Sequence, residues 1–172
     1  MTVTLRLATV EDAPALSRFG AAAFIDWYLP DNEPENVHAH VAATYQPELQ
    51  AAEIGEPGQW ALLAHVDGTL AGYGMLRINT PCPEGATQAD GELRRFYVGR
   101  DWHGQGLARQ LMQAVIQHGR DAGAKGLWLT CWERNPRALA FYAKCGFLRV
   151  GTATFTVGDD PQTDHLLALD LD

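Results

Sequence analysis

The feature that most constrains the fold is the run from Val98 to Ala124, where an apolar strand end meets a glycine turn and then a long amphipathic helix. Gly104 and Gly106 keep side chains out of the turn, so its backbone N–H groups can lie against an anion. Beyond the turn, apolar residues recur at the spacing of one helix face: Leu107, Leu111, Ala114 and Val115. The first unpaired amides of that helix and the positive end of its dipole would point into the turn, which predicts a phosphate or diphosphate site.

Two other interpretations of this turn have to be weighed. A glycine pair before a helix often does no more than let the chain change direction. The turn also matches neither GxxxxGK[ST] nor a full GxGxxG, because Ala108 and Leu111 follow the glycines. P-loop nucleotide hydrolysis and Rossmann dinucleotide binding are therefore poorly supported, and a phosphate-bearing ligand of another kind is the working hypothesis.

Length and cysteine usage set the class of protein. A chain of 172 residues is long enough to bury a full core as a single domain, residues 1–172, without disulfides or metals. Cys82, Cys131 and Cys145 are odd in number and lack CxxC spacing, so neither a disulfide framework nor a metal site is expected. No stretch approaches the roughly 18 apolar residues of a membrane span, and no signal-peptide core follows the first residues. We expect a cytoplasmic protein that binds no membrane.

The net charge of −8 argues against nucleic-acid binding, which calls for a basic stripe. Its distribution is uneven. Residues 1–93 hold three Arg, no Lys and thirteen acidic side chains, whereas residues 94–172 hold ten basic and eight acidic ones. This asymmetry favours a second half that binds a polyanion and a first half that attracts a cation, although acidic residues that serve only solubility would look the same.

Periodicity and turn chemistry predict an α+β chain that begins with a strand and several helices. Val3–Leu7 alternates as a strand, and a helix capped by Thr9 or Asp12 extends to about Ala23. Phe24–Pro34 breaks the period with two prolines and is expected to be a loop rich in aromatic and acidic residues. Two further helices are expected over residues 35–45 and 47–54.

The remainder alternates strands and helices. Residues 59–65 and 69–78 form a hairpin around Asp67-Gly68, and residues 79–90 form a surface loop. The strands at 92–98 and 127–132 flank the long helix, which predicts a crossover with parallel neighbours. Asn135 and Pro136 begin a short helix that runs to Lys144, and strands at 148–157 and 165–171 form a final hairpin joined by a polar loop, Gly158–Asp164.

Two blocks carry a resemblance that covers nearly the whole chain. FYVGRDWHGQGLARQLM resembles the strand and diphosphate loop of the GNAT acyl-CoA N-acyltransferases, written Q/R-x-x-G-x-G/A, with His103 at the first position, Gly106 at the central glycine and Ala108 at the last. NPRALAFYAKCGF resembles the asparagine and tyrosine helix of the same family. The resemblance implies a GNAT fold with α/β/α layers and a mixed central sheet of about seven strands.

Further stretches resemble one group within that superfamily, the bacterial spermidine/spermine N-acetyltransferases of the PaiA type. They are WERN at residues 132–135, FTVGDDPQTDHLL at 155–167, AFIDWYLPDNEPE at 23–35 and ATYQPEL at 43–49. The resemblance implies acetyl-CoA as donor, direct acetyl transfer to a small-molecule amine without a covalent enzyme intermediate, and no metal. It leaves a homodimer open.

The resemblance also assigns the donor site. Diphosphate would take the amides of residues 104–108, pantetheine would pair with the strand edge at residues 96–98, and the Val98 N–H would polarise the acetyl carbonyl. Asn135 would contact the CoA arm, cap its helix, or do both. The expected cofactor-binding residues are Phe96, Tyr97, Val98, Arg100, His103, Gly104, Gln105, Gly106, Leu107, Ala108, Arg109, Asn135 and Tyr142.

The expected catalytic residues are Tyr142, Glu92 and Glu133. Tyr142, with an ordinary pKa of about 10, is the candidate acid for the departing thiolate, unless it is only a core aromatic. An alkyl amine with a pKa of about 10.4 must lose a proton before it attacks, so a base is needed. Glu92 or Glu133 could act through water, while Arg94 stands where related enzymes often carry an acid. The expected acceptor site comprises Phe24, Trp27, Tyr28, Glu33 and Trp132.

The sequence therefore favours an acetyl-CoA-dependent N-acetyltransferase acting on a polyamine. Transfer to a protein amino-terminus, or to an antibiotic-like or amino-acid-like amine, would use the same apparatus. A non-catalytic acyl-CoA sensor is the alternative from another class, and the presence of Tyr142 counts against it.

Overall fold

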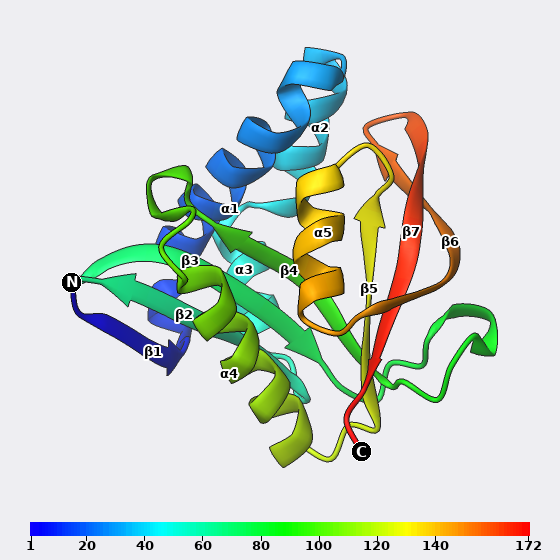
Figure 1. The fold of residues 1–172 in the computed structure, drawn as a ribbon. Coiled ribbons are helices and arrows are strands. Elements are labelled where there is room, and N and C mark those ends of the chain that lie inside the picture. Colours follow the sequence, from blue (N-terminus) through cyan, green and yellow to red (C-terminus); the bar gives the residue numbers. More distant parts are fainter.

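The computed structural model describes residues 1–172 and is built on a seven-stranded sheet with the order β1-β2-β3-β4-β5-β7-β6 (Figure 1). The strands are β1 (Val3–Leu7), β2 (Gln59–Val66), β3 (Thr69–Arg77), β4 (Gly91–Val98), β5 (Gly126–Trp132), β6 (Leu148–Val157) and β7 (Asp160–Asp170). The α-helices are α1 (Ala13–Tyr28), α2 (Pro34–Thr44), α3 (Pro47–Gly55), α4 (Leu107–Asp121) and α5 (Pro136–Lys144).

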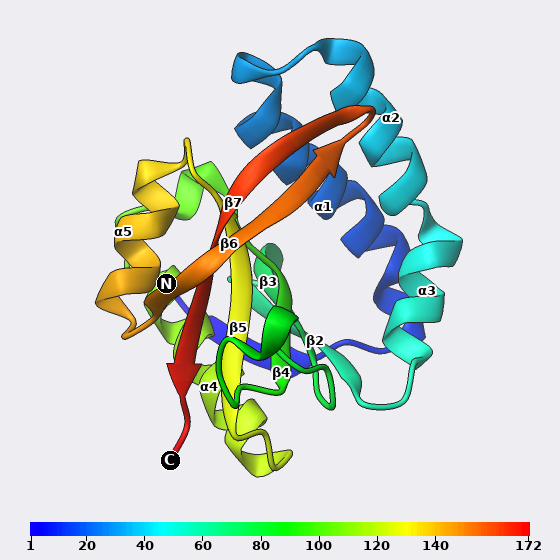
Figure 2. The same ribbon diagram turned by 90° about the vertical axis from the view of Figure 1, so that its right-hand side faces the viewer.

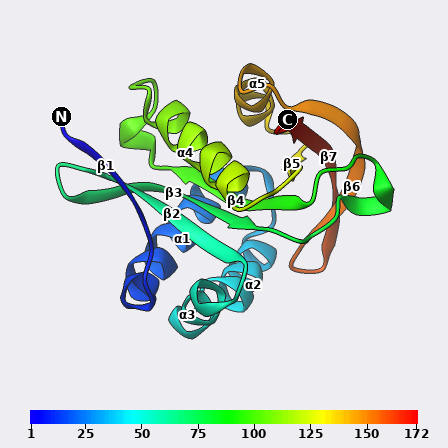
Figure 3. The same ribbon diagram turned by 90° about the horizontal axis from the view of Figure 1, so that it is seen from below.

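The helices cover both faces of this sheet. Viewed from below, α4 and α5 lie on one face, and α1, α2 and α3 lie on the other (Figure 3). The expected layers and the seven strands of a mixed sheet are confirmed. None of the helices combines the length and apolar character that a bilayer span requires.

The junction between β4 and β5 decides where a ligand can enter. Every other neighbouring pair in the sheet is antiparallel, whereas β4 and β5 are parallel, joined by the α4 crossover as expected. They pair only through Gly91 with Leu127 and Glu92 with Trp128, after which the two strands diverge (Figure 1). From Leu93 to Val98, β4 therefore has no strand partner on its β5 side.

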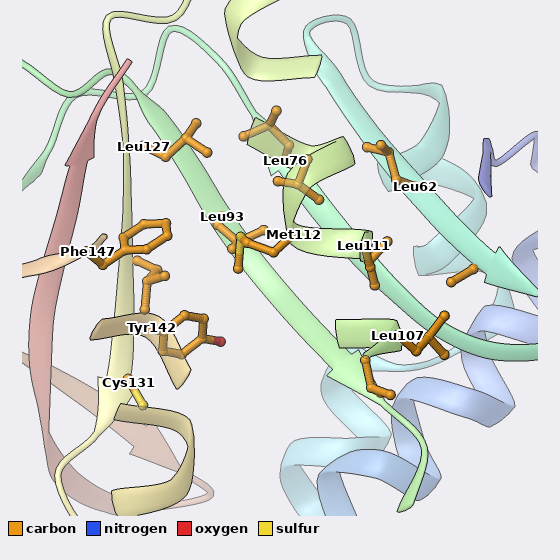
Figure 4. Close-up of a cluster of buried hydrophobic side chains, with 14 of the residues drawn as sticks. Leu62, Leu76, Leu93, Leu107, Leu111, Met112, Leu127, Cys131, Tyr142 and Phe147 are labelled. Atoms are coloured by element: carbon orange, nitrogen blue, oxygen red, sulfur yellow. The ribbon is translucent and has the colours of Figure 1, made fainter. Parts of the chain in front are cut away.

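The largest buried cluster lies beneath α4 and fixes the position of its first turn. Leu107, Leu111, Met112 and Val115 are each at most 1% exposed and pack against β3, β4 and β5, as Figure 4 shows for the first three. Burial of one such side chain contributes about 1.5–3 kcal/mol, so this face anchors the helix firmly. Gly74 allows the close approach, because a Cβ there would lie 2.8 Å from Cγ2 of Val115.

The expected loop at Phe24–Pro34 is wrong in its first half, because α1 continues to Tyr28. The helical period of its buried face runs on through Leu16, Gly20 and Phe24. Phe24 and Tyr28, four residues apart, stack at 4.2 Å between ring centroids. Pro30 then lies in a short 3-10 turn, Leu29–Asp31. The helix therefore ends two residues before this proline, at Tyr28, and not seven residues before it, at Ala23.

The expected loop at Gly158–Asp164 is also wrong. The β6–β7 turn is only Gly158-Asp159, and β7 begins at Asp160. Figure 2 shows this hairpin reaching α2, where the Asp159 N–H donates to Oδ1 of Asn36 at 3.4 Å (Figure 2). Pro161 is tolerated because β7 pairs with β5 only from Asp164 onward. Main-chain pairing with β6 therefore overrides the polar, turn-like composition.

Candidate functional site

A cleft of about 440 Å³ opens where β4 leaves β5. Its walls come from the end of β4, the glycine turn before α4, and one face of α5. The residues that line it are Trp27, Phe96, Val98, Trp102, His103, Gly104, Gly106, Ala108, Asn135, Arg137, Ala138, Ala140, Phe141, Tyr142 and Lys144. Seven of the expected cofactor contacts other than Tyr142 are among them: Phe96, Val98, His103, Gly104, Gly106, Ala108 and Asn135.

The glycine turn presents a row of free donors to this cleft. Gly104 and Gly106 have φ angles of 75° and 82°, the left-handed region that favours glycine. The Gly106 residue caps α4, and no amide of residues 104–109 donates a backbone hydrogen bond. A Cβ at either glycine would meet nothing within 4 Å, so the space above the turn is open. Free amides at a helix N-terminus with open space before them fit a diphosphate.

The free edge of β4 supplies a second set of polar groups. Nε2 of His103 donates to the Val98 carbonyl at 2.8 Å, and the next residue, Gly99, donates its N–H to Ala71 of the β3 side at 2.8 Å. Because residues in an extended strand alternate their direction, the N–H and C=O of Val98 face the cleft and those of Gly99 face β3. By the same alternation Phe96 also presents its main chain to the cleft. An extended ligand can thus add to this edge.

His103 and Arg100 are occupied by the protein itself. The His103 ring lies 5.8 Å from that of Trp27 and holds the end of β4 through Val98. The Arg100 guanidinium lies 5.7 Å over Trp27 and 3.6 Å from the Asp26 carboxylate. Both side chains therefore tie the turn to α1, and Arg100 does not line the cleft.

The other expected cofactor-binding residues lie either in the core of the protein or around the edge of the cleft. Leu107 is 1% exposed in the main core, and Gln105 turns its side chain back onto the Asp101 carbonyl at 2.7 Å. Arg109 lines an adjoining cavity of about 470 Å³. The Tyr97 hydroxyl shares a hydrogen bond with Tyr45 at 3.0 Å, beneath the strand. Leu107 and Gln105 can therefore offer a ligand their main-chain groups but not their side chains.

Four residues of α5 that line the cleft were missed by the sequence prediction. Arg137, Ala140, Phe141 and Lys144 all line the cleft, and they follow the i, i+3, i+4, i+7 spacing of one helix face. Arg137 and Lys144 bring two cations to the wall opposite the glycine turn. The spacing was present in the sequence, and it would have identified this face once the helix was known to flank the turn.

Beyond the cleft lies a smaller inner cavity of about 120 Å³ between β4 and β5. The two cavities share Trp27, Phe96, Asn135, Ala138 and Tyr142, so they adjoin. Asn135 caps α5 by accepting from the Ala138 N–H at 3.1 Å, which fulfils the expected capping role.

Tyr142 stands where the cleft meets the inner cavity. It is 9% exposed, and its hydroxyl points from α5 toward β4 in Figure 4 (Figure 4). Burial raises the pKa of Tyr142 well above its ordinary value, with Cys131 adding to the effect. The phenol is therefore neutral across the physiological range and available as a proton donor.

An outer cavity of about 610 Å³ lies on the other side and is strongly acidic. It is lined by Asp31, Glu33, Glu133 and Asp160, against a single basic side chain, Arg134. Trp132 lines both this cavity and the inner one. The inner cavity thus shares lining residues with the cleft on one side and with the outer cavity, through Trp132, on the other.

The expected acceptor residues are divided between these cavities. Trp27 and Tyr28 line the inner cavity, Glu33 the outer one, and Trp132 both. Tyr28 stacks on Trp132 at 5.4 Å. Phe24 is 1% exposed beneath Tyr28, so it supports the cavity wall without reaching the cavity.

The two expected bases also lie apart. Glu92 sits where β4 still pairs with β5, 3.9 Å from the Arg94 guanidinium, and lines none of the three cavities. Glu133 lines the outer cavity and is exposed. The carboxylate in the inner cavity is instead Asp164, which the sequence prediction placed in a loop. No group of three or more His, Cys, Asp or Glu side chains is arranged to hold a metal ion.

A turn with free amides, a free strand edge and a buried phenol between an open cleft and an acidic cavity fit a group-transfer enzyme whose donor is extended and carries phosphate. Comparison with known proteins agrees: the model of the acetyltransferase (GNAT) family matches residues 21–147. An uncharacterized N-acetyltransferase of Lactobacillus delbrueckii subsp. lactis is 32% identical over 157 residues, 91% of this chain and 91% of that protein. The chain therefore belongs to the GNAT family of acetyltransferases.

More distant relatives add two findings. A spermine/spermidine N(1)-acetyltransferase of Bacillus subtilis is 27% identical over 92 residues, 53% of this chain and 60% of that protein. The crystal structure of PaiA N-acetyltransferase from Thermoplasma acidophilum in complex with coenzyme A superimposes with a TM-score of 0.80 at 19% identity, covering 99% of each chain. The second likeness establishes the fold alone.

Proposed function

We propose that this N-acetyltransferase uses acetyl-CoA to acetylate a polyamine of the spermidine/spermine class. The observation that carries the proposal is a series of three cavities linked by shared lining residues: a cleft with free amides and two cations, a small aromatic chamber at Tyr142, and an acidic outer cavity. A polyanionic donor and a polycationic acceptor would approach from opposite sides and meet at the middle chamber.

On the donor side, the diphosphate would bind the amides of residues 104–109, with Arg137 and Lys144 of α5 supplying positive charge. The pantetheine arm would pair with the free edge of β4 at Phe96 and Val98. This pairing would bring the acetyl carbonyl to the Val98 N–H, which stabilises the negative charge that develops on the carbonyl oxygen. The protein would thus orient the donor and stabilise the charge that develops on its carbonyl oxygen.

At the reacting centre, the amine nitrogen forms a bond to the carbonyl carbon, and the C–S bond then breaks with its electron pair on sulfur. Tyr142 would donate its hydroxyl proton to that sulfur and recover a proton from the nitrogen. An ordinary thiol has a pKa of about 8.5, so the leaving thiolate is the weaker base, and its hydrogen bond to the neutral phenol already lowers the barrier to departure. Walls of Trp27, Tyr28 and Trp132 would keep bulk water away from the thioester.

On the acceptor side, the acidic outer cavity fits a chain with several ammonium groups better than a single amine or a peptide. The aromatic faces of Tyr28 and Trp132 would pack against its methylene groups. The B. subtilis spermine/spermidine N(1)-acetyltransferase, related over half of this chain, gives independent support for this class of acceptor.

The test is a panel of acceptors with radiolabelled acetyl-CoA: spermidine, spermine, propylamine, an aminoglycoside and a peptide with a free amino-terminus. We expect kcat/KM for spermidine or spermine to exceed that for propylamine by about 100-fold, equivalent to about 2.7 kcal/mol from the distal ammonium groups. Faster turnover of the peptide or the aminoglycoside would refute the polyamine assignment. Binding of CoA without turnover of any amine would show that the protein is a sensor.

A further inference from the structure

Asp164 is a buried carboxylate without a full set of partners, in the chamber where the reaction would take place. The residue is 2% exposed, and its Oδ1 has no hydrogen-bond partner. A carboxylate with a free oxygen in an apolar site is costly, so its position calls for an explanation. The other acidic residues of the molecule are less buried.

The sheet holds this side chain in place. Asp164 lies opposite Trp132 of β5 on one side and opposite Ala153 of β6 on the other, so β7 is paired on both edges at this residue. Residues opposite one another in a sheet share a face, and Trp132 lines the inner cavity. The carboxylate therefore faces the same chamber as Tyr142, which projects into it from α5.

We propose that Asp164 binds the ammonium group of the acceptor through its free oxygen and accepts the proton that the amine must lose before it attacks. Tyr142 would then donate a proton to the leaving sulfur, and Asp164 would accept a proton from the attacking nitrogen. One nitrogen proton passes to Asp164 before the N–C bond forms. The second nitrogen proton replaces the one that Tyr142 gives to sulfur, so each turnover releases one proton through Asp164 to water.

The alternatives are weaker on geometry. Glu92 is held in an ion pair with Arg94 at the closed end of the gap and lines none of the three cavities. Glu133 is exposed and lines the outer cavity but not the chamber. Only Asp164 combines burial, an unused acceptor oxygen and a place beside Tyr142.

Other groups near the chamber set the proton affinity of Asp164. Burial raises the pKa of Asp164 to about 6, Glu133 adds to this rise, and a hydrogen bond from Thr130 opposes it. At pH 7 and above the carboxylate would be ionised and able to accept a proton. The titratable and charged side chains that face it or line its chamber are Tyr28 from α1, Arg94, Arg95 and Tyr97 from β4, Cys131 from β5, Glu133 from the loop before α5, and Tyr142 from α5, while β6 contributes none.

The acceptor role rests on the proposed N-acetyltransferase activity, and the experiment separates the two. We would compare wild type with Asp164→Asn, which keeps the shape and removes the charge, and with Asp170→Asn, an exposed aspartate of the same strand. CoA affinity by calorimetry and thermal unfolding would be measured for each, followed by kcat and KM for spermidine from pH 5.5 to 9. If spermidine is not acetylated, the best amine of the acceptor panel takes its place, because any alkylammonium must lose a proton.

We expect Asp164→Asn to bind CoA within twofold of wild type and to lose at least about 100-fold in kcat/KM at pH 7.5, within the usual contribution of a positioned base. The loss should shrink as pH rises and free amine accumulates, whereas Asp170→Asn should follow wild type throughout. A folded Asp164→Asn protein with kcat/KM within threefold of wild type would overturn the proposal. So would a loss of the same size at every pH, because that result indicates a structural role.

Discussion

Replacement of Asp164 by Asn should make the free protein more stable, and the gain should depend on pH. The pKa of Asp164 rises from its ordinary value of 3.8 to about 6, chiefly because burial disfavours the charged form. At about 1.36 kcal/mol for each pKa unit, this rise corresponds to about 3 kcal/mol lost once the group is ionised in both states. Screening and structural relaxation around the carboxylate reduce this cost, so we expect about 1–2 kcal/mol.

The sign follows from the direction of the pKa change. Below about pH 4 the carboxyl is protonated in both the folded and the unfolded chain, and Asp164 costs little. Between about pH 4 and pH 6 the unfolded chain gives up its proton more readily than the folded one, so wild-type stability falls across this window. The Asn variant lacks this titration. Its advantage should therefore be a few tenths of a kcal/mol at pH 4 and about 1–2 kcal/mol at pH 8.

Urea unfolding at pH 4 and pH 8, with the same variant and with Asp170→Asn as the exposed control, measures this difference directly. A change in midpoint without a change in the slope m would show that the unfolded state is unaffected. For a chain of this length, 1–2 kcal/mol corresponds to about 2–8 °C in Tm. An advantage that is equal at the two pH values, or a loss of stability at pH 8, would show that the carboxylate is solvated or paired and would refute the reasoning.

Three further substitutions test the donor side. Tyr142→Phe should lower kcat by about 100-fold or more with CoA affinity within twofold, as steady-state kinetics and calorimetry would show; unchanged kcat removes the acid role. Gly106→Val should weaken CoA binding by at least about tenfold, because its φ of 82° disfavours a β-branched residue and the side chain would fill the space above the turn. Gly85→Val, at φ 64° in a remote loop, shares the strain, so equal CoA affinities of the two variants would count against the turn as the anion site. The double variant Arg137→Ala/Lys144→Ala should raise the Kd for CoA about five- to twentyfold and flatten its salt dependence, measured by calorimetry at two ionic strengths, whereas an unchanged salt slope would place these cations outside the phosphate site.

Local signals were enough to predict the backbone of the glycine turn. Gly104 and Gly106 before an amphipathic helix require a particular backbone whatever surrounds them, and the structure gives both glycines positive φ angles. The hairpin around Asp67-Gly68 is confirmed for the same reason, since its turn chemistry needs no tertiary information. Elements of this kind can be predicted because their sequences allow few alternatives.

The secondary structure of two segments near the proposed acceptor site could not be predicted in this way. Polar residues before Asp164 resemble a turn, and only pairing with β6 shows that they form a strand. Phe24 and Tyr28 look like loop aromatics beside two prolines, until packing beneath the sheet shows that α1 continues through them. In both segments long-range contacts outweigh local composition, which a single sequence does not display.

The positions of both the free β4 edge and Asp164 follow from the separation of β4 and β5. Because β4 loses its partner after Glu92, its edge is left free, and this is where we propose that the donor binds. Because β5 keeps its own pairing with β7 as far as Trp132, Asp164 is carried to the opposite side of the same gap. A shift of one residue in the β5–β7 register would turn the Asp164 side chain to the other face of the sheet. Asp164, the proposed proton acceptor, is thus positioned by register across three strands, whereas the glycine turn is formed by two glycines. This difference explains why only the turn could be predicted from the sequence.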